Sequence, residues 1–260
     1  MNGDLYRPPR RGRGVDSRNL RDELSPVDFD LLDDVVSRIL SKVTAKSEFE
    51  IEVQVHDLML KNVTYVNRNR CQEHTIEGPF LEKKGVCEGI AKAVKYLLDA
   101  KGVGCELVTG RLRSGNDLHM WNLVRVEGEW RHLDVTYDLG VTDGGAYRHD
   151  CFNLSDVEIM RSHEIIDSPH RCGRSRDSYY HRRGLVFDTR ARFTDHIESE
   201  LRAGRREVVF KIPACRDPAK VADEVFECTS EAMSRLGIGG TMLVTPNPEH
   251  LVYSVRVSES

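Results

Sequence analysis

Cys87 lies where a polar, glycine-bearing segment gives way to a helical pattern of apolar residues. The surrounding sequence reads Lys84-Gly85-Val86-Cys87-Glu88-Gly89-Ile90-Ala91-Lys92-Ala93. The first turn of a helix has backbone N–H groups without partners inside the helix and a partial positive charge, and both favour a thiolate over a thiol. A lone cysteine is more often a small buried residue. A catalytic role therefore also requires a base and a group that orients the base.

A predicted β-hairpin downstream of this helix supplies both groups. We expect strands over residues 119–126 and 130–135, joined by a two-residue loop at Glu127-Gly128. Because residues two apart on a strand share a face, such a loop makes His119 and Asp134 diagonal neighbours on one face. A loop with an odd number of residues would move Asp134 to the opposite face.

Cys87, His119 and Asp134 are the residue types of a catalytic triad. The thiolate of Cys87 would attack an amide carbonyl, His119 would protonate the leaving amine, and Asp134 would hold the imidazole in one tautomer. Water or an amine would then resolve the acyl-enzyme. Each residue alone has a simpler explanation: a strand histidine is often structural, and an aspartate can end a strand.

The element expected to position the thiol is a central helix over residues 87–101, whose apolar face carries Ile90, Val94, Leu97 and Leu98. We expect it to pack on a three-stranded antiparallel meander. The preceding segment 66–84 is polar and is predicted to be a loop, and the stretch 162–183 is predicted to be irregular. The other elements expected in this half are helices from Ser25 to about Val43 and from Ser47 to about Lys61, an extended segment at 62–65, the strand 105–112, and a short helix after the capping box Ser155-Asp156-Val157-Glu158.

From Gly184 onward the pattern is that of a compact α/β unit. Its expected elements are strands at 185–187, 208–212, 242–245 and 251–257 and helices at 191–203 and 218–236. We therefore divide the chain into a disordered basic arm (1–24), a catalytic domain (25–183) and a C-terminal α/β unit (184–260). The expected fold class is α+β.

Composition narrows the function classes. The chain has 260 residues, 31% of them charged, and a formal net charge of −4. It has no apolar run near the roughly 20 residues of a membrane span and no apolar signal sequence at its N-terminus, so we expect a cytoplasmic protein without a membrane partner. The arginine-rich arm lacks interleaved aromatic residues, so we expect no nucleic-acid partner. Seven scattered cysteines without a CxxC pair favour free thiols and no structural zinc.

Three segments together resemble a known family. Gly85-Val86-Cys87-Glu88-Gly89, His119-Met120-Trp121-Asn122 and Trp130-Arg131-His132-Leu133-Asp134-Val135-Thr136 are similar to the signature segments of the transglutaminase-like superfamily, especially its bacterial cysteine peptidase branch. The resemblance covers about residues 50–165. It implies a papain-like core and assigns Cys87, His119 and Asp134 as nucleophile, base and orienting residue.

The resemblance also implies a substrate cleft bordered by the segment with Tyr65 and His74, and we expect the backbone N–H of Cys87 and the hydroxyl of Tyr65 to stabilise the oxyanion. Tyr65 could equally be a core tyrosine with a satisfied hydroxyl. Trp121 and Trp130 could also line the cleft, but we favour the interpretation that they close the hydrophobic side of the hairpin. We interpret His132 as structural, because its sequence context differs from that of the family histidine.

The leading functional hypothesis is a thiol-dependent amide-bond hydrolase of the cysteine peptidase kind, acting on a peptide or protein substrate without a cofactor. The alternatives are a protein-glutamine acyltransferase with the same triad and a non-catalytic peptide-binding module that retains the fold. No calcium loop and no zinc-binding cysteine pairs are present in the sequence. A metal site at His163, His170, Cys172 and His181 matches no zinc spacing. Substrate identity, oligomeric state and the role of the C-terminal unit remain open.

Overall fold

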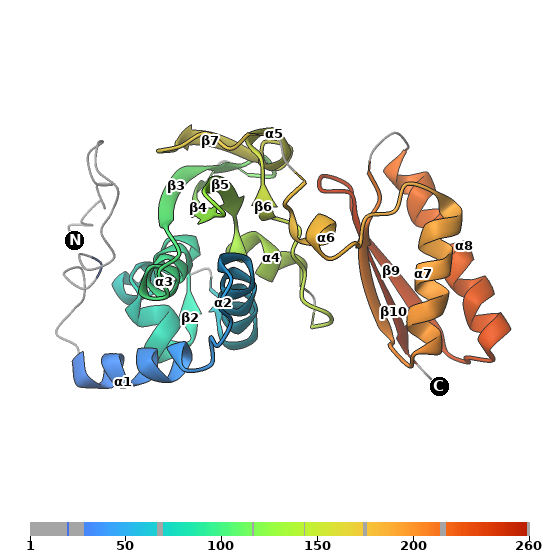
Figure 1. Ribbon diagram of the computed structural model, residues 1–260, viewed down its shortest axis with the longest axis horizontal. Coiled ribbons are helices and arrows are strands. Elements are labelled where there is room, and N and C mark those ends of the chain that lie inside the picture. Colours follow the sequence, from blue (N-terminus) through green and yellow to red (C-terminus); the bar gives the residue numbers. More distant parts are fainter. Residues whose placement is uncertain are drawn as a thin grey trace.

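The computed structural model describes residues 20, 29–66, 70–115, 117–142, 144–173, 176–213 and 217–258. The predicted basic arm and the predicted helix start at Ser25 lie outside these residues, except that Leu20 is buried in the core. Helices and an antiparallel sheet form the larger part of the molecule, and a second, smaller sheet with its own helices lies at the other end (Figure 1). The α+β class is therefore confirmed. None of the helices described combines the length and apolar character needed to cross a membrane.

Five strands form the central sheet in the order β6-β5-β4-β3-β7, and every neighbouring pair is antiparallel. Strands β3, β4 and β5 are the predicted meander, whereas β6 and β7 were not predicted. The strands are β3 (Cys105–Leu112), β4 (Leu118–Val126), β5 (Glu129–Leu133), β6 (Phe152–Leu154) and β7 (His163–Asp167).

The turn between β4 and β5 has the predicted two residues. Glu127 and Gly128 both have positive φ, 53° and 87°, which is the backbone of a type I′ hairpin turn. Val126 is paired with Glu129 as a result. The loop parity on which the position of Asp134 depends is therefore confirmed.

Strand β5 ends at Leu133, one residue before Asp134, which was predicted to lie on the strand. The prediction that it continues through Asp134 to Val135 is wrong, because Asp134 is the N-cap of a helix that was not predicted, α4 (Val135–Val141). Its Oδ1 accepts a hydrogen bond from the backbone N–H of Tyr137 at 2.9 Å. The β-forming residues of this segment favoured a strand locally, and the capping interaction overrides that preference.

Helices α2 (Glu48–Asn62) and α3 (Cys87–Ala100) pack on one side of the sheet, and α1 (Phe29–Leu40) joins the same core by packing against the segment Gly78–Glu82. The side chain of Ser47 caps α2 by accepting from the N–H of Glu50 at 3.3 Å, as its sequence predicts. Helix α3 packs on β3 and β4, and Ile90, Val94, Leu97 and Leu98 on its apolar face are all fully buried.

Two segments predicted to be irregular contain regular structure. The predicted loop at 66–84 includes a 3₁₀ helix (Cys71–His74), a π-helical turn (Gly78–Glu82) and the start of β2 (Lys84–Gly85), which pairs in parallel with β1 (Thr64–Tyr65). The predicted irregular stretch at 162–183 includes β7 and the short helix α6 (Tyr179–Arg182). The short helix α5 (Asp156–Ile159) begins at the predicted capping box of Ser155 and Glu158.

The C-terminal residues form a second, three-stranded antiparallel sheet in the order β8-β10-β9. Two helices cover one of its faces (Figure 1), and these elements enclose a separate hydrophobic cluster. The predicted strand at 185–187 is wrong, since that segment makes only an isolated bridge between Val186 and Lys211. The elements are α7 (Arg190–Arg202), β8 (Glu207–Lys211), α8 (Pro218–Leu236), β9 (Thr241–Asn247) and β10 (Val252–Ser258).

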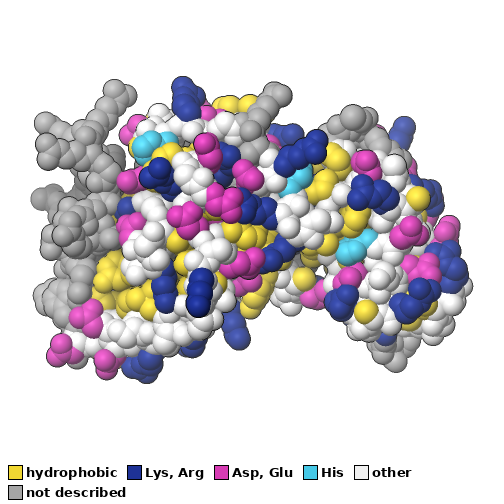
Figure 2. Space-filling model, in the orientation of Figure 1, with side chains coloured by type: hydrophobic (Ala, Val, Ile, Leu, Met, Phe, Trp, Pro, Cys, Tyr) yellow, Lys and Arg dark blue, Asp and Glu magenta, His cyan; other side chains and the backbone are white. Residues whose placement is uncertain are grey.

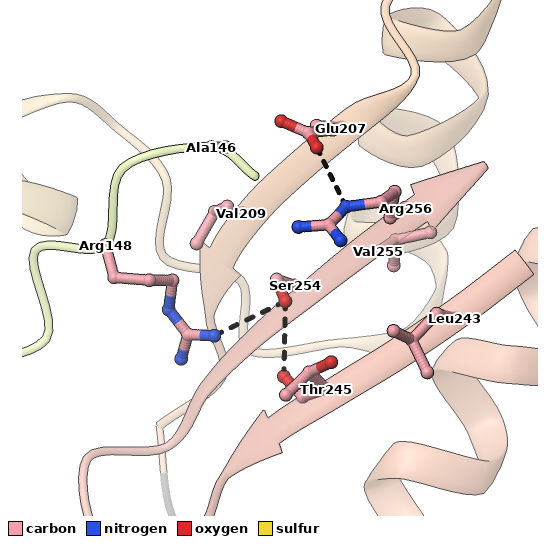
Figure 3. Close-up of a pocket in the computed structure, with 9 residues that line it drawn as sticks. All are labelled: Ala146, Arg148, Glu207, Val209, Leu243, Thr245, Ser254, Val255 and Arg256. Atoms are coloured by element: carbon pink, nitrogen blue, oxygen red, sulfur yellow. Dashed lines mark hydrogen bonds and ion pairs between the residues drawn. The ribbon is translucent and has the colours of Figure 1, made fainter. Parts of the chain in front are cut away.

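The other face of this small sheet meets the segment that follows α4. Figure 3 shows Arg148 pointing at Ser254, to whose hydroxyl it donates at 3.3 Å, and Arg256 paired with Glu207 at 2.8 Å. The recess between them holds about 10 Å³, room for roughly one water molecule. On the molecular face drawn in Figure 2, acidic and basic side chains are interspersed, so the coloured residues of this face form no extended patch of one charge.

Candidate active site

Cys87 is the first residue of α3 and is partly exposed. Its neighbour Val86 is the N-cap and provides no side-chain cap, so the first-turn N–H groups of α3 have no partner within the helix. The N–H of Val86 donates to the carbonyl of Glu73 at 3.1 Å, which fixes the chain just before the cysteine. A side chain at Gly89 would collide with that same carbonyl of Glu73. The glycine two residues after Cys87 therefore allows the 3₁₀ helix to lie directly on the first turn of α3.

His119 and Asp134 contact each other as the hairpin geometry predicts. Nε2 of His119 lies 2.5 Å from Oδ2 of Asp134, and both side chains are buried. Because this contact occupies Nε2, Nδ1 is the ring nitrogen left to face another partner. Cys87 lies near enough to His119 to raise the pKa of its imidazole.

The charge states of this pair follow from competition between burial and neighbouring groups. Burial lowers the pKa of His119, but the charge and hydrogen bond of Asp134, followed by those of Cys87, raise it from 6.5 to about 10. Burial raises the pKa of Asp134, but the charge and hydrogen bond of His119, followed by those of His163, hold it well below its usual range. The favoured state is a carboxylate beside an imidazolium.

A second histidine shares the same carboxylate oxygen. Nε2 of His163, on β7, lies 2.9 Å from Oδ2 of Asp134. Nδ1 of His163 lies 2.7 Å from the hydroxyl of Ser162, and that hydroxyl lies 2.7 Å from Nε2 of His250, which follows β9 in the C-terminal unit. All three residues are buried. We call His163, Ser162 and His250 the backing network.

A carboxylate only accepts, so His163 donates from Nε2 to Asp134. The hydroxyl of Ser162 joins the two imidazoles of the backing network and also lies 3.4 Å from the carbonyl of Ile159, to which it can donate. Burial lowers the pKa of His250 to about 3, so this imidazole is neutral, and its Nδ1 is buried without a partner among the described residues. The C-terminal unit therefore contributes, through a continuous chain of hydrogen bonds, to the position of Asp134.

A cleft of about 670 Å³ opens beside His119. Its walls are largely apolar, formed by Val63, Leu112, Leu139 and Val141, and they also include the phenol groups of Tyr65 and Tyr137. The parallel pairing of β1 with β2 places Tyr65 opposite Gly85, two residues before Cys87. Burial raises the pKa of Tyr65, and the negative charges of Cys87, Asp117 and Asp134 raise it further. The hydroxyl of Tyr65 is thus kept as a proton donor.

Two other residues expected at the cleft lie elsewhere. His74 is not among the residues that line it, and Nδ1 of His74 instead lies 2.9 Å from Oε2 of Glu88. Trp121 is buried, 1% exposed, in a cluster with Val108 and Leu123. Its ring stacks on that of His119 with a centroid separation of 5.8 Å, behind the imidazole. Trp121 therefore supports His119 and does not contact the cleft.

His132, interpreted above as structural, belongs to a separate network. Its Nδ1 accepts from the indole N–H of Trp121 at 2.9 Å, and its Nε2 lies 2.9 Å from Oδ1 of Asp156. Burial lowers the pKa of His132. This imidazole is consequently held neutral, with both nitrogens occupied.

Among the described residues, three groups bring potential metal-ligating atoms within 4.8 Å of one another. The first group is His56, Asp57 and His149; the second is His119, Asp134 and His163; the third is His132, Asp156 and Cys172. In each group the carboxylate already accepts hydrogen bonds from its imidazoles. The four residues weighed as a metal site from the sequence do not come together. His163 lies at Asp134, Cys172 lies near Asp156, the ring of His170 stacks on Trp130, and Nδ1 of His181 lies 2.7 Å from the hydroxyl of Ser178.

Comparison with known proteins agrees with the family resemblance. Residues 34–135 match the sequence profile of the transglutaminase-like superfamily. No curated protein sequence matches the chain.

Solved structures with similar folds include three that differ in their described roles. A TGase is 15% identical, with 51% of this chain and 39% of that chain covered and a TM-score of 0.39. A candidate cysteine protease from Cytophaga hutchinsonii is 19% identical, with 45% of this chain and 42% of that chain covered and a TM-score of 0.37. Menin, described with its binding site for the Mixed Lineage Leukemia protein, is 16% identical, with 85% of this chain and 46% of that chain covered and a TM-score of 0.35. The chain thus spans less than half the length of each of these proteins.

The matched segment includes α2, α3, the meander β3 to β5 and Asp134, which are the elements that bring Cys87, His119 and Asp134 together. The part of the chain that is similar to the transglutaminase-like superfamily is therefore the part that builds this site.

Proposed function

We propose that the protein is a thiol-dependent amide-bond hydrolase that works through an acyl-enzyme on Cys87. The observation that carries this proposal is the buried 2.5 Å contact between Nε2 of His119 and Oδ2 of Asp134, which leaves Nδ1 for the cysteine at the start of α3. A raised pKa of His119 favours an imidazolium that holds a thiolate as its partner. Residues 34–135 are similar to the transglutaminase-like superfamily, whose members are cysteine peptidases or acyltransferases.

In the proposed reaction, the thiolate sulfur of Cys87 forms a bond to the carbonyl carbon of an amide. First-turn N–H groups of α3, together with the hydroxyl of Tyr65, would donate to the resulting oxyanion. The imidazolium of His119 gives its proton to the leaving amine, the C–N bond breaks, and a thioester remains on Cys87. Water then gives a proton to the now neutral imidazole as its oxygen attacks the thioester carbonyl, the C–S bond breaks, and release of the acid restores the thiolate of Cys87 and the imidazolium of His119.

Incubation with a glutamine-containing peptide and a labelled primary amine separates hydrolysis from acyl transfer. We expect release of ammonia or a peptide fragment at a rate that does not depend on the amine. A Cys87→Ser variant serves as the control and should release neither. Incorporation of the amine without net hydrolysis would show that the protein is an acyltransferase with the same triad, and it would overturn the hydrolase proposal.

A further inference from the structure

The C-terminal unit reaches the catalytic cleft with one acidic side chain. Glu249 lies in the turn between β9 and β10 and is one of the residues that line the cleft beside His119. It is the only carboxylate among those lining residues, which include no lysine or arginine. Within the part of the chain that the structure describes, Glu249 forms no ion pair.

The position of Glu249 is fixed by buried neighbours on both sides. Nδ2 of Asn247 donates to Oδ2 of Asp150 at 2.7 Å and to the hydroxyl of Tyr137 at 3.1 Å. Oδ1 of Asn247 accepts from the backbone N–H of Glu249 at 3.2 Å. On the other side, His250 is buried and bound to Ser162. The turn is therefore held in one conformation against the catalytic unit.

The carboxylate itself is oriented by Tyr137. Because the hydroxyl of Tyr137 accepts from Asn247, its own proton is directed to Oε2 of Glu249, at 2.9 Å. This bond leaves Oε1 of Glu249 available to a ligand in the cleft. Glu249 is exposed at the edge of the cleft, and its carboxylate is preorganised there with one free oxygen, so it attracts a cation more strongly than a freely rotating glutamate does.

The other charged groups at the cleft are of both signs. Tyr65, on the opposite strand pair, is affected by the negative charges of Asp117 and Asp134 as well as that of Cys87, whereas the imidazolium of His119 is positive and is paired with Asp134. Near Glu249 the nearest charge is its own carboxylate, so a carboxylate of a ligand placed there would be repelled and an ammonium or guanidinium group would be attracted.

We propose that Glu249 is a specificity-determining residue that selects substrates carrying a protonated amine or a guanidinium group next to the reactive amide, as a lysine or arginine side chain provides. This inference rests on the proposed function, because it names the substrate class of the same cleft. It also assigns a role to the C-terminal unit, which completes the cleft with this side chain.

The direct test uses the charge of small thiol reagents and needs no turnover. Cys87 is modified with methanethiosulfonates that carry either a trimethylammonium or a sulfonate group, and its modification is followed by mass spectrometry of the peptide that contains it. We expect the ratio of cationic to anionic rates to fall about 3- to 10-fold in Glu249→Gln and further in Glu249→Lys. Glu231→Gln, which removes the same charge from the exposed surface of α8, is the matched control and should leave the ratio unchanged. An unchanged ratio in Glu249→Gln would overturn the proposal.

A second arm identifies which part of the substrate carries the cation. Peptides with lysine or glutamate on the acyl side of the amide are compared with peptides that carry the same residues on the amine side. We expect the wild-type preference for lysine to fall about 3- to 10-fold in Glu249→Gln and to weaken with added salt. If no peptide is cleaved by any variant, the proposed function fails, whereas the reagent ratio still decides the role of Glu249. Cleavage that prefers glutamate over lysine in the wild-type protein would contradict the proposal directly.

Discussion

Replacing Asp134 with asparagine removes the negative charge from the centre of the site while keeping its shape. The side-chain oxygen of asparagine can still cap the N–H of Tyr137, so α4 should form as before. The amide nitrogen, however, can only donate, and it would face two imidazole nitrogens that donate to Asp134 in the wild-type protein. We expect the variant to fold and to lose most of the reactivity of Cys87.

The size of the effect follows from the pKa of His119. Its rise from 6.5 to about 10 corresponds to roughly 5 kcal/mol in favour of the imidazolium, at about 1.4 kcal/mol per pKa unit. Asp134 is the largest favourable contributor, and burial opposes the charge. Without the carboxylate the pKa of His119 should fall, and the thiolate of Cys87 should lose its cationic partner. We expect the rate of Cys87 alkylation at pH 6 to drop by up to about 300-fold, because an ordinary cysteine, with a pKa of about 8.5, is only about 0.3% thiolate at that pH.

The pH dependence has a defined sign. In the wild-type protein the imidazolium of His119 persists until the pH rises through about 10, so catalytic activity should decline there and at a lower pH in Asp134→Asn. The ion pair of His119 and Asp134 stabilises the folded state fully between pH 3.8 and pH 6.5, which are the ordinary pKa values of aspartate and histidine. This stabilisation is lost as the pH rises toward 10. The difference in unfolding free energy between wild type and variant should therefore be largest in that lower window.

The assay compares Asp134→Asn with a matched variant, Asp156→Asn. Asp156 also accepts from an imidazole, that of His132 at 2.9 Å, but this pair does not contact Cys87. Alkylation by iodoacetamide is measured by mass spectrometry from pH 5 to 11, with thermal unfolding as a check on folding. Equal alkylation profiles for the two folded variants would refute the assigned role of Asp134.

Two further predictions concern the elements that support the site. A side chain at Gly110 would collide with the backbone carbonyl of Glu164 on β7 and lie 2.5 Å from Cη2 of Trp121. Gly110→Ala should therefore destabilise the protein by about 1–3 kcal/mol and lower the alkylation rate of Cys87, whereas Gly115→Ala, with nothing within 4 Å, should do neither in the same denaturation and alkylation assays. Ser162→Ala would deprive the two imidazoles of the backing network of their shared partner, and chemical denaturation should show a loss of about 1–3 kcal/mol; an unchanged stability would contradict a supporting role for that network.

The local sequence was sufficient to predict the parts of the site whose geometry depends on short-range rules. The position of Cys87 follows from helix periodicity, and the contact between His119 and Asp134 follows from the parity of a turn at Glu127-Gly128 that requires positive φ. These features depend on residues close together in the chain. They were therefore accessible without knowledge of the tertiary structure.

The backing network was missed because its contacts are long-range. His163 lies on an edge strand in which only that residue is buried, so β7 shows no alternation of apolar and polar residues. The adjacent isoleucines Ile165 and Ile166 were the available β-strand signal. His250 and Ser162 are 88 residues apart, and their contact arises only when the C-terminal unit packs against the central sheet.

The cleft was predicted less well than the triad for a related reason. Tyr65 lines it because a two-residue parallel pairing places β1 beside β2. Trp121 was expected there from its position near His119 in the chain, yet strand alternation and packing against Val108 bury it behind the imidazole. Glu249 comes from a unit for which the sequence indicated no function.

The central claim is that Cys87 is a nucleophile held as a thiolate by His119. The most direct measurement is the extent of iodoacetamide labelling of each of the seven cysteines at pH 6, in the wild-type protein and in His119→Gln. We predict stoichiometric labelling of Cys87 ahead of the other six in the wild-type protein, and loss of that advantage in the variant. Labelling of Cys87 no faster than that of the other cysteines in the wild-type protein would contradict the account.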